Sequence, residues 1–283
     1  MGFFEMAAWY ETENLPFALL QLIERRGSTP LHSASMLVDG QGEIHGTLGG
    51  GMLERLAIDE ALQALIQEEN RLFEARLTRQ GDKAVGADCG GSVTIHIAVY
   101  PSRPELYLLG GGHVNREVAK AACAAGFRTT VCDTWEKNLQ HPDLPEPCSR
   151  VYGANFDEIV GRLPLSERSY VVIATNHEDY EALSAVIKSP LAYLGLLGSR
   201  RKVQTLHERL IEHSAATPLQ LENLRAPLGL DIGAQTPGEL AISIVGELIQ
   251  TRRQSKKATV SSRCQMDNPP LKTAAKFKAE VTG

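Results

Sequence analysis

The sequence predicts an α/β protein of two domains, in which an N-terminal α+β domain precedes a domain built on a parallel sheet. The length of 283 residues is about twice that of an average domain. Prolines at positions 101 and 104 mark a linker. Before it, apolar residues alternate as in antiparallel strands, whereas after it strands and helices follow one another as in βαβ units. We therefore expect domains at 1–103 and 104–253, followed by a disordered tail at 254–283.

The first domain shows the periods of both strands and a helix. An apolar stretch leads to a turn-like Gly27–Pro30 segment, and a polar turn at 39–42 indicates a hairpin. Apolar residues at spacings of three and four predict a helix over 53–65, and alternation predicts two later strands. The expected strands and apolar stretch lie at 17–23, 35–38, 44–48, 73–77 and 93–99.

The second domain alternates strand and helix throughout. Its expected strands are 106–109, 129–132, 150–152, 170–174 and 191–197, and its expected helices are 114–125, 157–163, 178–188 and 199–213. The last helix begins with a capping box, in which Thr236 is the N-cap, Pro237 takes the first position and Glu239 reaches back. From Gln254 the pattern stops, and six basic and two acidic residues predict a solvated, basic tail.

Charge, hydropathy and cysteine spacing exclude several classes of protein. The 34 acidic and 29 basic residues give a formal net charge of -5, which argues against a nucleic-acid-binding protein. The sequence lacks an apolar run of the roughly 18–20 residues that a membrane span needs, and its start lacks the pattern of a signal peptide. The five cysteines are scattered without a CxxC pair, so we expect reduced thiols in a cytoplasmic protein.

A glycine-rich turn in LYLLGGGHVNREVAK follows the first strand of the second domain. Gly110 and Gly112 let the backbone approach a pyrophosphate, and the following helix presents N–H donors. Asp133 ends the next strand, where an acceptor for a ribose hydroxyl belongs. Asn115 replaces the third glycine of the GxGxxG pattern. These residues predict a Rossmann-like domain, with NAD(P) as a candidate ligand; the alternative is a glycine-rich turn that binds no nucleotide.

A basic cluster opens the helix in LGLLGSRRK. Ser199 begins that helix, and Arg200, Arg201 and Lys202 follow in its first turn, where the helix dipole disfavours cations. The arrangement indicates a bound anion such as a phosphate, and the alternative is a solvated basic face. In ATNHEDYEAL, His177 follows a strand and is a candidate proton donor, unless it only packs on the next helix.

Two segments of the first domain are also candidate sites. Gly49, Gly50 and Gly51 lie between a strand and a helix, as a close approach to a ligand or a tight turn would require. Cys89 precedes Gly90 and Gly91 in DCGGSVTI, so its thiol is a candidate metal ligand or nucleophile, or else a small buried apolar side chain. The sequence contains no HExxH, GxSxG or P-loop pattern.

Seven segments, in order, resemble the XdhC/CoxI family, the accessory proteins of xanthine dehydrogenase and related molybdenum hydroxylases. They are RRGSTPLHSASMLV, GTLGGGMLE, DCGGSVTI, LYLLGGGHVNREVA, ATNHEDYEAL, LGLLGSRRK and APLGLDIGAQTPGELAISIVGELI. The resemblance extends to about residue 252 and implies an N-terminal CoxI-type domain with a C-terminal Rossmann-type domain. Met52 stands where many members have a cysteine after the three glycines, which leaves Cys89 as the cysteine to which the family's cofactor-holding role is carried over.

The resemblance implies a maturation factor, a non-catalytic chaperone rather than a conventional enzyme. Such a protein binds the molybdenum cofactor (molybdopterin), supports its sulfuration and delivers it to an apo molybdenum hydroxylase of the xanthine dehydrogenase type. A cysteine desulfurase is the second implied partner, and a homodimer the implied assembly. Two further hypotheses stay open: an NAD(P)-dependent oxidoreductase, and a nucleotide-sensing module that uses the glycine turn without turnover.

Overall fold

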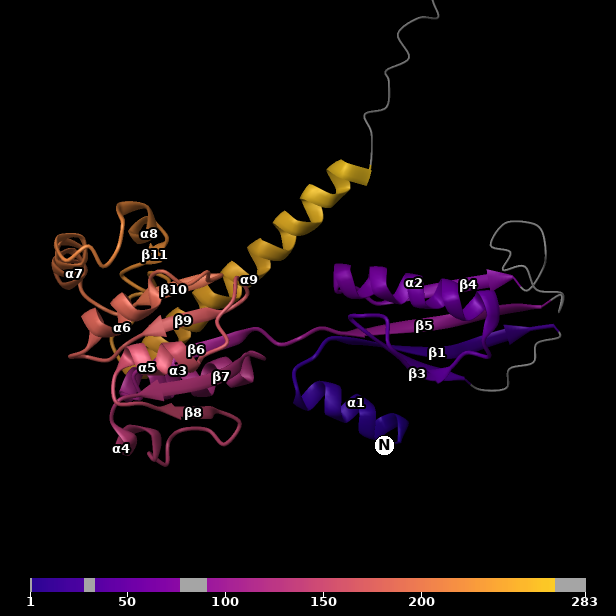
Figure 1. Cartoon of the computed structure of the whole chain (residues 1–283), viewed down its shortest axis with the longest axis horizontal. Helices are drawn as coiled ribbons and strands as arrows, with labels where there is room; N and C mark the ends of the chain where they lie inside the picture. Colours follow the sequence, from indigo (N-terminus) through magenta and orange to yellow (C-terminus); the bar gives the residue numbers. More distant parts are fainter. Residues whose placement is uncertain (1, 28–33, 77–90, 268–283) are drawn as a thin grey trace, which may run out of the picture. The chain divides into compact units, whose positions relative to one another are not determined.

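The computed structural model describes residues 2–27, 34–76 and 91–267, which form two compact units (Figure 1). Unit 1 spans Met1–Arg103 and unit 2 spans Pro104–Gly283. Each unit has its own sheet and its own buried apolar clusters. Each unit is therefore described by itself.

Unit 1 contains a five-stranded antiparallel sheet in the order β3-β2-β1-β5-β4. The hairpin of β2 and β3 turns at Asp39, whose Oδ1 accepts hydrogen bonds from the N–H groups of Gln41 and Glu43 at 2.8 and 2.9 Å. The hairpin predicted from the polar turn is therefore present. The strands are β1 (Phe17–Arg26), β2 (Ser35–Asp39), β3 (Ile44–Thr47), β4 (Arg71–Arg76) and β5 (Ser92–Tyr100).

Two helices cover the two faces of this sheet. The helix α2 (Gly51–Gln67) buries Leu53, Ala57, Ala61 and Ala64 against one face, as the apolar spacing predicts. The helix α1 (Phe3–Thr12), which the sequence pattern did not reveal, packs Tyr10 on the other face. Its N-cap is Gly2, without a capping side chain, so the usual start signal is absent.

Unit 2 contains a six-stranded parallel sheet in the order β11-β10-β9-β6-β7-β8. The order reverses between β6 and β9, and ligands of open parallel sheets bind at such a reversal, outside the carboxyl ends of the strands. The Rossmann-like domain expected from the alternating pattern is confirmed. The strands are β6 (Glu105–Leu109), β7 (Arg128–Asp133), β8 (Ser149–Tyr152), β9 (Tyr170–Ile173), β10 (Tyr193–Leu196) and β11 (Leu224–Arg225).

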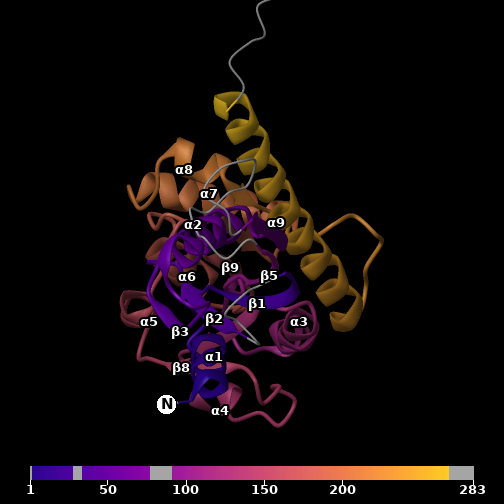
Figure 2. The same cartoon turned by 90° about the vertical axis from the view of Figure 1, so that its right-hand side faces the viewer.

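Helices cover both faces of the parallel sheet. On one face, α3 (His113–Ala124) and α9 (Pro237–Asp267) pack against each other and against β6 and β9 (Figure 2). The short helix α4 adds Leu139 to the cluster of α3 and α9, whereas the cluster on the other face involves α5, α6, α7 and α8. Both α4 and α8 are too short for the sequence pattern to predict. The remaining helices of unit 2 are α4 (Glu136–Leu139), α5 (Phe156–Arg162), α6 (Asp179–Val186), α7 (Arg200–Glu212) and α8 (Pro218–Glu222).

The helix α9 begins as predicted but ends later. Glu239 Oε2 accepts hydrogen bonds from the N–H groups of Gln235 and Thr236 at 2.8 and 2.9 Å, which completes the predicted cap. The helix continues to Asp267, so residues 254–267 are helical where a disordered tail is expected from the sequence. Helix propensity explains the difference, because Lys, Arg, Gln and Ala favour a helix even where no apolar face is repeated. Residues 268–283 lie outside the described residues.

The close approach of β6 and β9 depends on Gly110. Its φ is +101°, and a Cβ at this position would lie 2.5 Å from the carbonyl oxygen of Ala174. Gly126 also has a positive φ, of +81°, but a Cβ there would meet no atom within 4 Å. A side chain at Gly126 would therefore meet backbone strain alone, whereas a side chain at Gly110 would meet both backbone strain and a steric conflict.

We predict that Gly110→Ala lowers the free energy of unfolding by at least about 3 kcal/mol, since it adds a clash to the strain of a positive φ. The matched variant Gly126→Ala should cost only about 1 kcal/mol, because it introduces the strain alone. Urea unfolding followed by circular dichroism measures both losses. Equal losses would show that the contact with Ala174 does not constrain the turn.

Candidate functional site

The candidate site lies at the carboxyl edge of the parallel sheet, which we define as the edge where the strands of unit 2 end. Its centre is the glycine turn, Gly110–Gly112, between β6 and α3. The N–H of Gly110 donates to the carbonyl of Cys132 at 2.7 Å, and the N–H of Gly111 donates to Asp133 Oδ2 at 2.5 Å. Gly112 is the N-cap of α3 and supplies no side chain, so no side chain caps the first helical N–H groups. Such groups are donors for an anion.

Asp133 supports the glycine turn from within the protein. Its side chain is buried, and besides Gly111 it accepts a hydrogen bond from the N–H of Trp135 at 2.7 Å and from Asn138 Nδ2 at 2.9 Å. Three donors take up most of the acceptor capacity of a carboxylate. The arrangement favours a structural role for Asp133, in contrast to the exposed ribose acceptor that its position in the sequence suggests.

Asn115 and Arg116 complete the buried support of the turn. Asn115 stands at the position of the third glycine of the GxGxxG pattern. Its Nδ2 donates to the carbonyl oxygens of Leu109 and Gly110 at 3.1 and 2.7 Å, so the side chain holds the turn by hydrogen bonds. Arg116 Nη1 donates to the carbonyl of Gly111 at 3.1 Å, and both side chains are buried. The role of Arg116 is not evident from the sequence, since nothing in its spacing shows that a charged side chain turns back to the preceding loop.

The loop after β9 lies beside the glycine turn, because the Cβ position of Gly110 approaches Ala174 and Thr175. The N–H and hydroxyl of Thr175 both donate to Asp179 Oδ1, at 3.0 and 2.8 Å. The other oxygen of Asp179, a buried side chain, forms an ion pair with Lys202 of α7. Asn176, which follows Thr175 in this loop, has a φ of +73°, in the left-handed region of the backbone. A continuous set of contacts thus joins the glycine turn to the start of α7.

The start of α7 carries cations of two kinds. Ser199 is its N-cap, and the hydroxyl of Ser199 accepts a hydrogen bond from the N–H of Lys202 at 3.3 Å. Lys202 is neutralised by Asp179, whereas Arg200 and Arg201 are exposed and form no ion pair with another described residue. The basic cluster that predicts a bound anion therefore consists of one lysine that is paired within the protein and two arginines that are available to a ligand.

His177 is exposed on the loop after β9, and no hydrogen bond of its side chain is present among the described residues. The next residue, Glu178, accepts a hydrogen bond from the hydroxyl of Thr134 at 2.7 Å. Because Thr134 follows β7, this bond joins loops from two strands that flank β6. The structure therefore brings Gly110, Gly112, Asp133, His177, Ser199, Arg200 and Arg201 to one edge of one sheet.

The N-terminal glycine loop, Gly49–Gly51, differs from the glycine turn because a side chain of the protein occupies it. All three glycines have positive φ angles, of +97°, +77° and +73°. Glu54 Oε2 accepts hydrogen bonds from Thr47 Oγ1, the N–H of Leu48 and the N–H of Gly50, at 2.6, 2.8 and 3.2 Å. The hydroxyl of Thr47, followed by the backbone donors, lowers the pKa of Glu54, although partial burial opposes this. An internal carboxylate thus stands where a phosphate would bind.

The other candidates of unit 1 are only partly described. Cys89 and Gly90 lie outside the described residues, while Gly91 is buried directly before β5. Met52 is exposed at the start of α2. Within residues 2–27, 34–76 and 91–267, no group of three or more metal-ligating side chains is present. The same ranges contain no helix long and apolar enough to cross a membrane.

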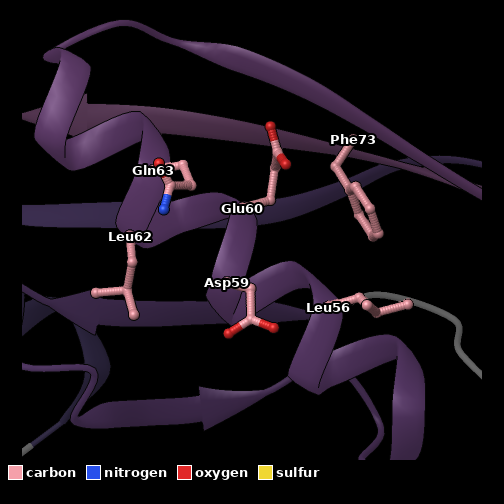
Figure 3. A pocket seen from close by; sticks show the side chains of 6 residues that line it. All are labelled: Leu56, Asp59, Glu60, Leu62, Gln63 and Phe73. Carbon is pink, nitrogen blue, oxygen red and sulfur yellow. The ribbon is translucent and has the colours of Figure 1, made fainter. Parts of the chain in front are cut away.

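A separate hollow of about 310 Å³ lies on unit 1, lined by side chains of α2 and β4 (Figure 3). Two acidic side chains, Asp59 and Glu60, line it, and Glu60 forms an ion pair with Arg71. Negative charge at its wall disfavours a phosphate-bearing ligand. None of the candidate site residues predicted from the sequence lines this hollow. Its lining residues are Leu56, Asp59, Glu60, Leu62, Gln63 and Phe73.

The fold and the glycine turn define a two-domain protein whose second domain is of the Rossmann class. Comparison with family models gives two matches, one described as the XdhC and CoxI family over residues 11–75 and one described as the XdhC Rossmann domain over residues 106–248. The chain therefore belongs to the XdhC and CoxI family, as its motifs predict.

Two curated proteins and a solved structure are among the proteins similar to this chain. An Escherichia coli (strain K12) protein described as "Uncharacterized protein YqeB" is 44% identical over 255 residues, covering 90% of this chain and 47% of that protein. A Bacillus subtilis (strain 168) protein, described as a probable subunit of xanthine dehydrogenase, is 31% identical over 154 residues, covering 54% and 44%. The chain spans about half the length of these curated relatives.

The solved structure is that of a xanthine dehydrogenase (BH1974) from Bacillus halodurans. It aligns with a TM-score of 0.50 and 20% identity, covering 90% of this chain and 96% of that one. At this identity the likeness bears on the fold alone.

We predict that Glu54→Gln lowers the free energy of unfolding of unit 1 by about 1 kcal/mol at pH 7, because a neutral amide accepts hydrogen bonds less strongly than a carboxylate. The pKa of Glu54 is lowered in the folded state. Its stabilising effect is therefore complete above the usual glutamate pKa of about 4.3 and is lost as the pH falls through the lowered value.

The measurement is chemical unfolding at a series of pH values. The matched control Asp59→Asn removes an exposed carboxylate of the same helix that forms no hydrogen bond with another described residue. It should change stability by less than about 0.5 kcal/mol. A difference between Glu54→Gln and the parent that stays constant down to pH 3 would contradict the assignment.

Proposed function

We propose that this protein is an accessory factor that holds the molybdenum cofactor for an apo enzyme of the xanthine dehydrogenase type. Membership of the XdhC and CoxI family carries the proposal, because both domains match in the expected order. One curated relative is itself described as a probable subunit of xanthine dehydrogenase. Sulfuration of the cofactor with a cysteine desulfurase, delivery to the apo enzyme and a homodimeric state in the cytoplasm belong to the same proposal.

The geometry supports the carboxyl edge of unit 2 as the place for the phosphate of the pterin. The first helical N–H groups of α3 have no side-chain cap, because the N-cap residue Gly112 has no side chain. Arg200 and Arg201 supply exposed positive charge at the same edge, which an anionic ligand needs. The N-terminal glycine loop is the weaker candidate, because Glu54 already accepts hydrogen bonds from the N–H groups of Gly50 and of Leu48 just before the loop.

Cys89 remains our candidate ligand for the molybdenum. A thiolate is a soft donor and suits a metal that is transferred onward with sulfur ligands. Because Cys89 and Gly90 lie outside the described residues, its role rests on the DCGGSVTI motif and on the family resemblance.

A dinucleotide-binding function is the second candidate, either as an NAD(P)-dependent oxidoreductase or as a nucleotide-sensing module. The parallel sheet with its glycine turn favours it. The internal hydrogen bonds of Asp133 count against it, because the residue placed for a ribose hydroxyl already supports the turn. Calorimetry with NAD, NADP and the molybdenum cofactor, run side by side, distinguishes the two functions. Saturable dinucleotide binding without affinity for the cofactor would overturn our proposal.

We predict that the double variant Arg200→Gln/Arg201→Gln binds the molybdenum cofactor about tenfold more weakly, since it removes charged donors from the anion. Gel filtration of protein mixed with cofactor, followed by metal analysis, measures what is retained. The control Arg55→Gln/Lys188→Gln removes the same charge from exposed positions on α2 and after α6. Equal weakening of cofactor binding by both double variants would show that the effect comes from the net charge of the protein and not from Arg200 and Arg201.

We predict that Cys89→Ala loses most of its bound molybdenum, because alanine has no donor atom for a metal. The matched control Cys264→Ala removes a cysteine that lies in none of the candidate motifs, and it should retain as much molybdenum as the parent. The same gel-filtration assay applies. Equal retention by Cys89→Ala and the parent would remove Cys89 from the cofactor site.

A further inference from the structure

Two cysteines that are far apart in the sequence meet in unit 2. Cys123 lies in the last turn of α3, and Cys148 directly precedes β8. Their Sγ atoms are 3.3 Å apart, whereas the sulfurs of a disulfide are about 2.05 Å apart. The sulfurs must approach each other by little more than 1 Å to form a bond.

The two thiols differ in their access to solvent. Cys148 is only 7% exposed and lies in the apolar cluster of α3 and α9, while Cys123 is half-buried. The hydrogen bond with Cys123, and then burial, raise the pKa of the Cys148 thiol. Cys123 is thus the thiol that an external reagent reaches first, and Cys148 is placed to act second.

Cys132 provides an internal comparison. It is fully buried inside β7, where burial raises its pKa to about 12, and it has no sulfur partner among the described residues. A fully buried thiol with a raised pKa and no sulfur beside it is inert, because an external oxidant cannot reach it and no neighbouring mixed disulfide can form. Burial alone therefore explains Cys132, whereas the paired sulfurs of Cys123 and Cys148 need a further explanation.

We propose that Cys123 and Cys148 are a redox-modification site that forms a reversible disulfide with low-molecular-weight disulfides such as oxidised glutathione. Cys123, as a thiolate, attacks one sulfur of the reagent, which forms a mixed disulfide and releases one reduced thiol. Cys148 then attacks the Cys123 sulfur, which releases the second reduced thiol. The two protein thiols lose two electrons, the reagent gains them, and both protons pass to the released thiols.

The pair lies at the edge of the sheet opposite the candidate site. Cys148 precedes the start of β8, and α3 ends close to the start of β7, whereas the glycine turn follows the end of β6. The crosslink closes a loop that contains β7 and α4, the elements that carry Asp133 and Asn138. Oxidation therefore stabilises the support of the glycine turn without covering the carboxyl edge.

The test equilibrates the full-length protein in buffers of increasing ratio of oxidised to reduced glutathione. Free thiols are then alkylated, and the peptides are analysed by mass spectrometry. We expect a peptide pair joined through Cys123 and Cys148, lighter by two hydrogens, which disappears with excess reduced glutathione. Oxidation should raise the melting temperature by roughly 5–10 °C, since it closes a loop of about 25 residues.

The variants Cys123→Ser and Cys148→Ser should each abolish the crosslink and the rise in melting temperature, while Cys264→Ser keeps both. Circular dichroism confirms that each serine variant is folded before oxidation. Complete alkylation of both cysteines at every glutathione ratio would overturn the proposal, as would a glutathione adduct on Cys123 that never resolves. A crosslink that forms only in denaturant would overturn it as well.

Discussion

The buried hydrogen bond from the N–H of Gly111 to the carboxylate of Asp133 is the interaction on which the candidate site depends. It fixes the glycine turn to the end of β7, and Asn115 and Arg116 fix the same turn through its carbonyl oxygens. The turn is therefore preorganised from within, which leaves the first N–H groups of α3 without a side-chain cap. A binding edge that is rigid before the ligand arrives loses less entropy when the ligand binds.

The two glycine-rich segments look alike in sequence but differ in electrostatics. At the N-terminal glycine loop, the carboxylate of Glu54 accepts hydrogen bonds from the N–H groups of Gly50 and the preceding Leu48. In the glycine turn, the carboxylate of Asp133 lies behind the turn, and Gly111 is the one residue of the turn whose N–H it accepts. An anion would compete with Glu54 at the first segment, whereas it meets free donors at the second. Because of this difference, we place the phosphate of the ligand in unit 2.

The sequence predicted those parts of the fold that follow from a repeated apolar pattern. The strands β2 to β10, the helix α2 and the cap of α9 are of this kind, because period and capping are local properties. The short elements α4, α8 and β11 were not predicted, since their packing against distant segments determines them. The same limit applied to the site. Spacing located the glycine turn, but it could not show that Asp133 faces inward or that Cys123 meets Cys148.

The most direct test follows the backbone amides of the 283-residue chain by NMR while the molybdenum cofactor is added. The account predicts that the amide resonances of Gly112, His113 and Val114 shift saturably, because these N–H groups receive the phosphate. The amides of the N-terminal glycine loop should not move, since Glu54 already occupies it. Shifts confined to Gly49–Gly51, with an unchanged start of α3, would contradict the central claim.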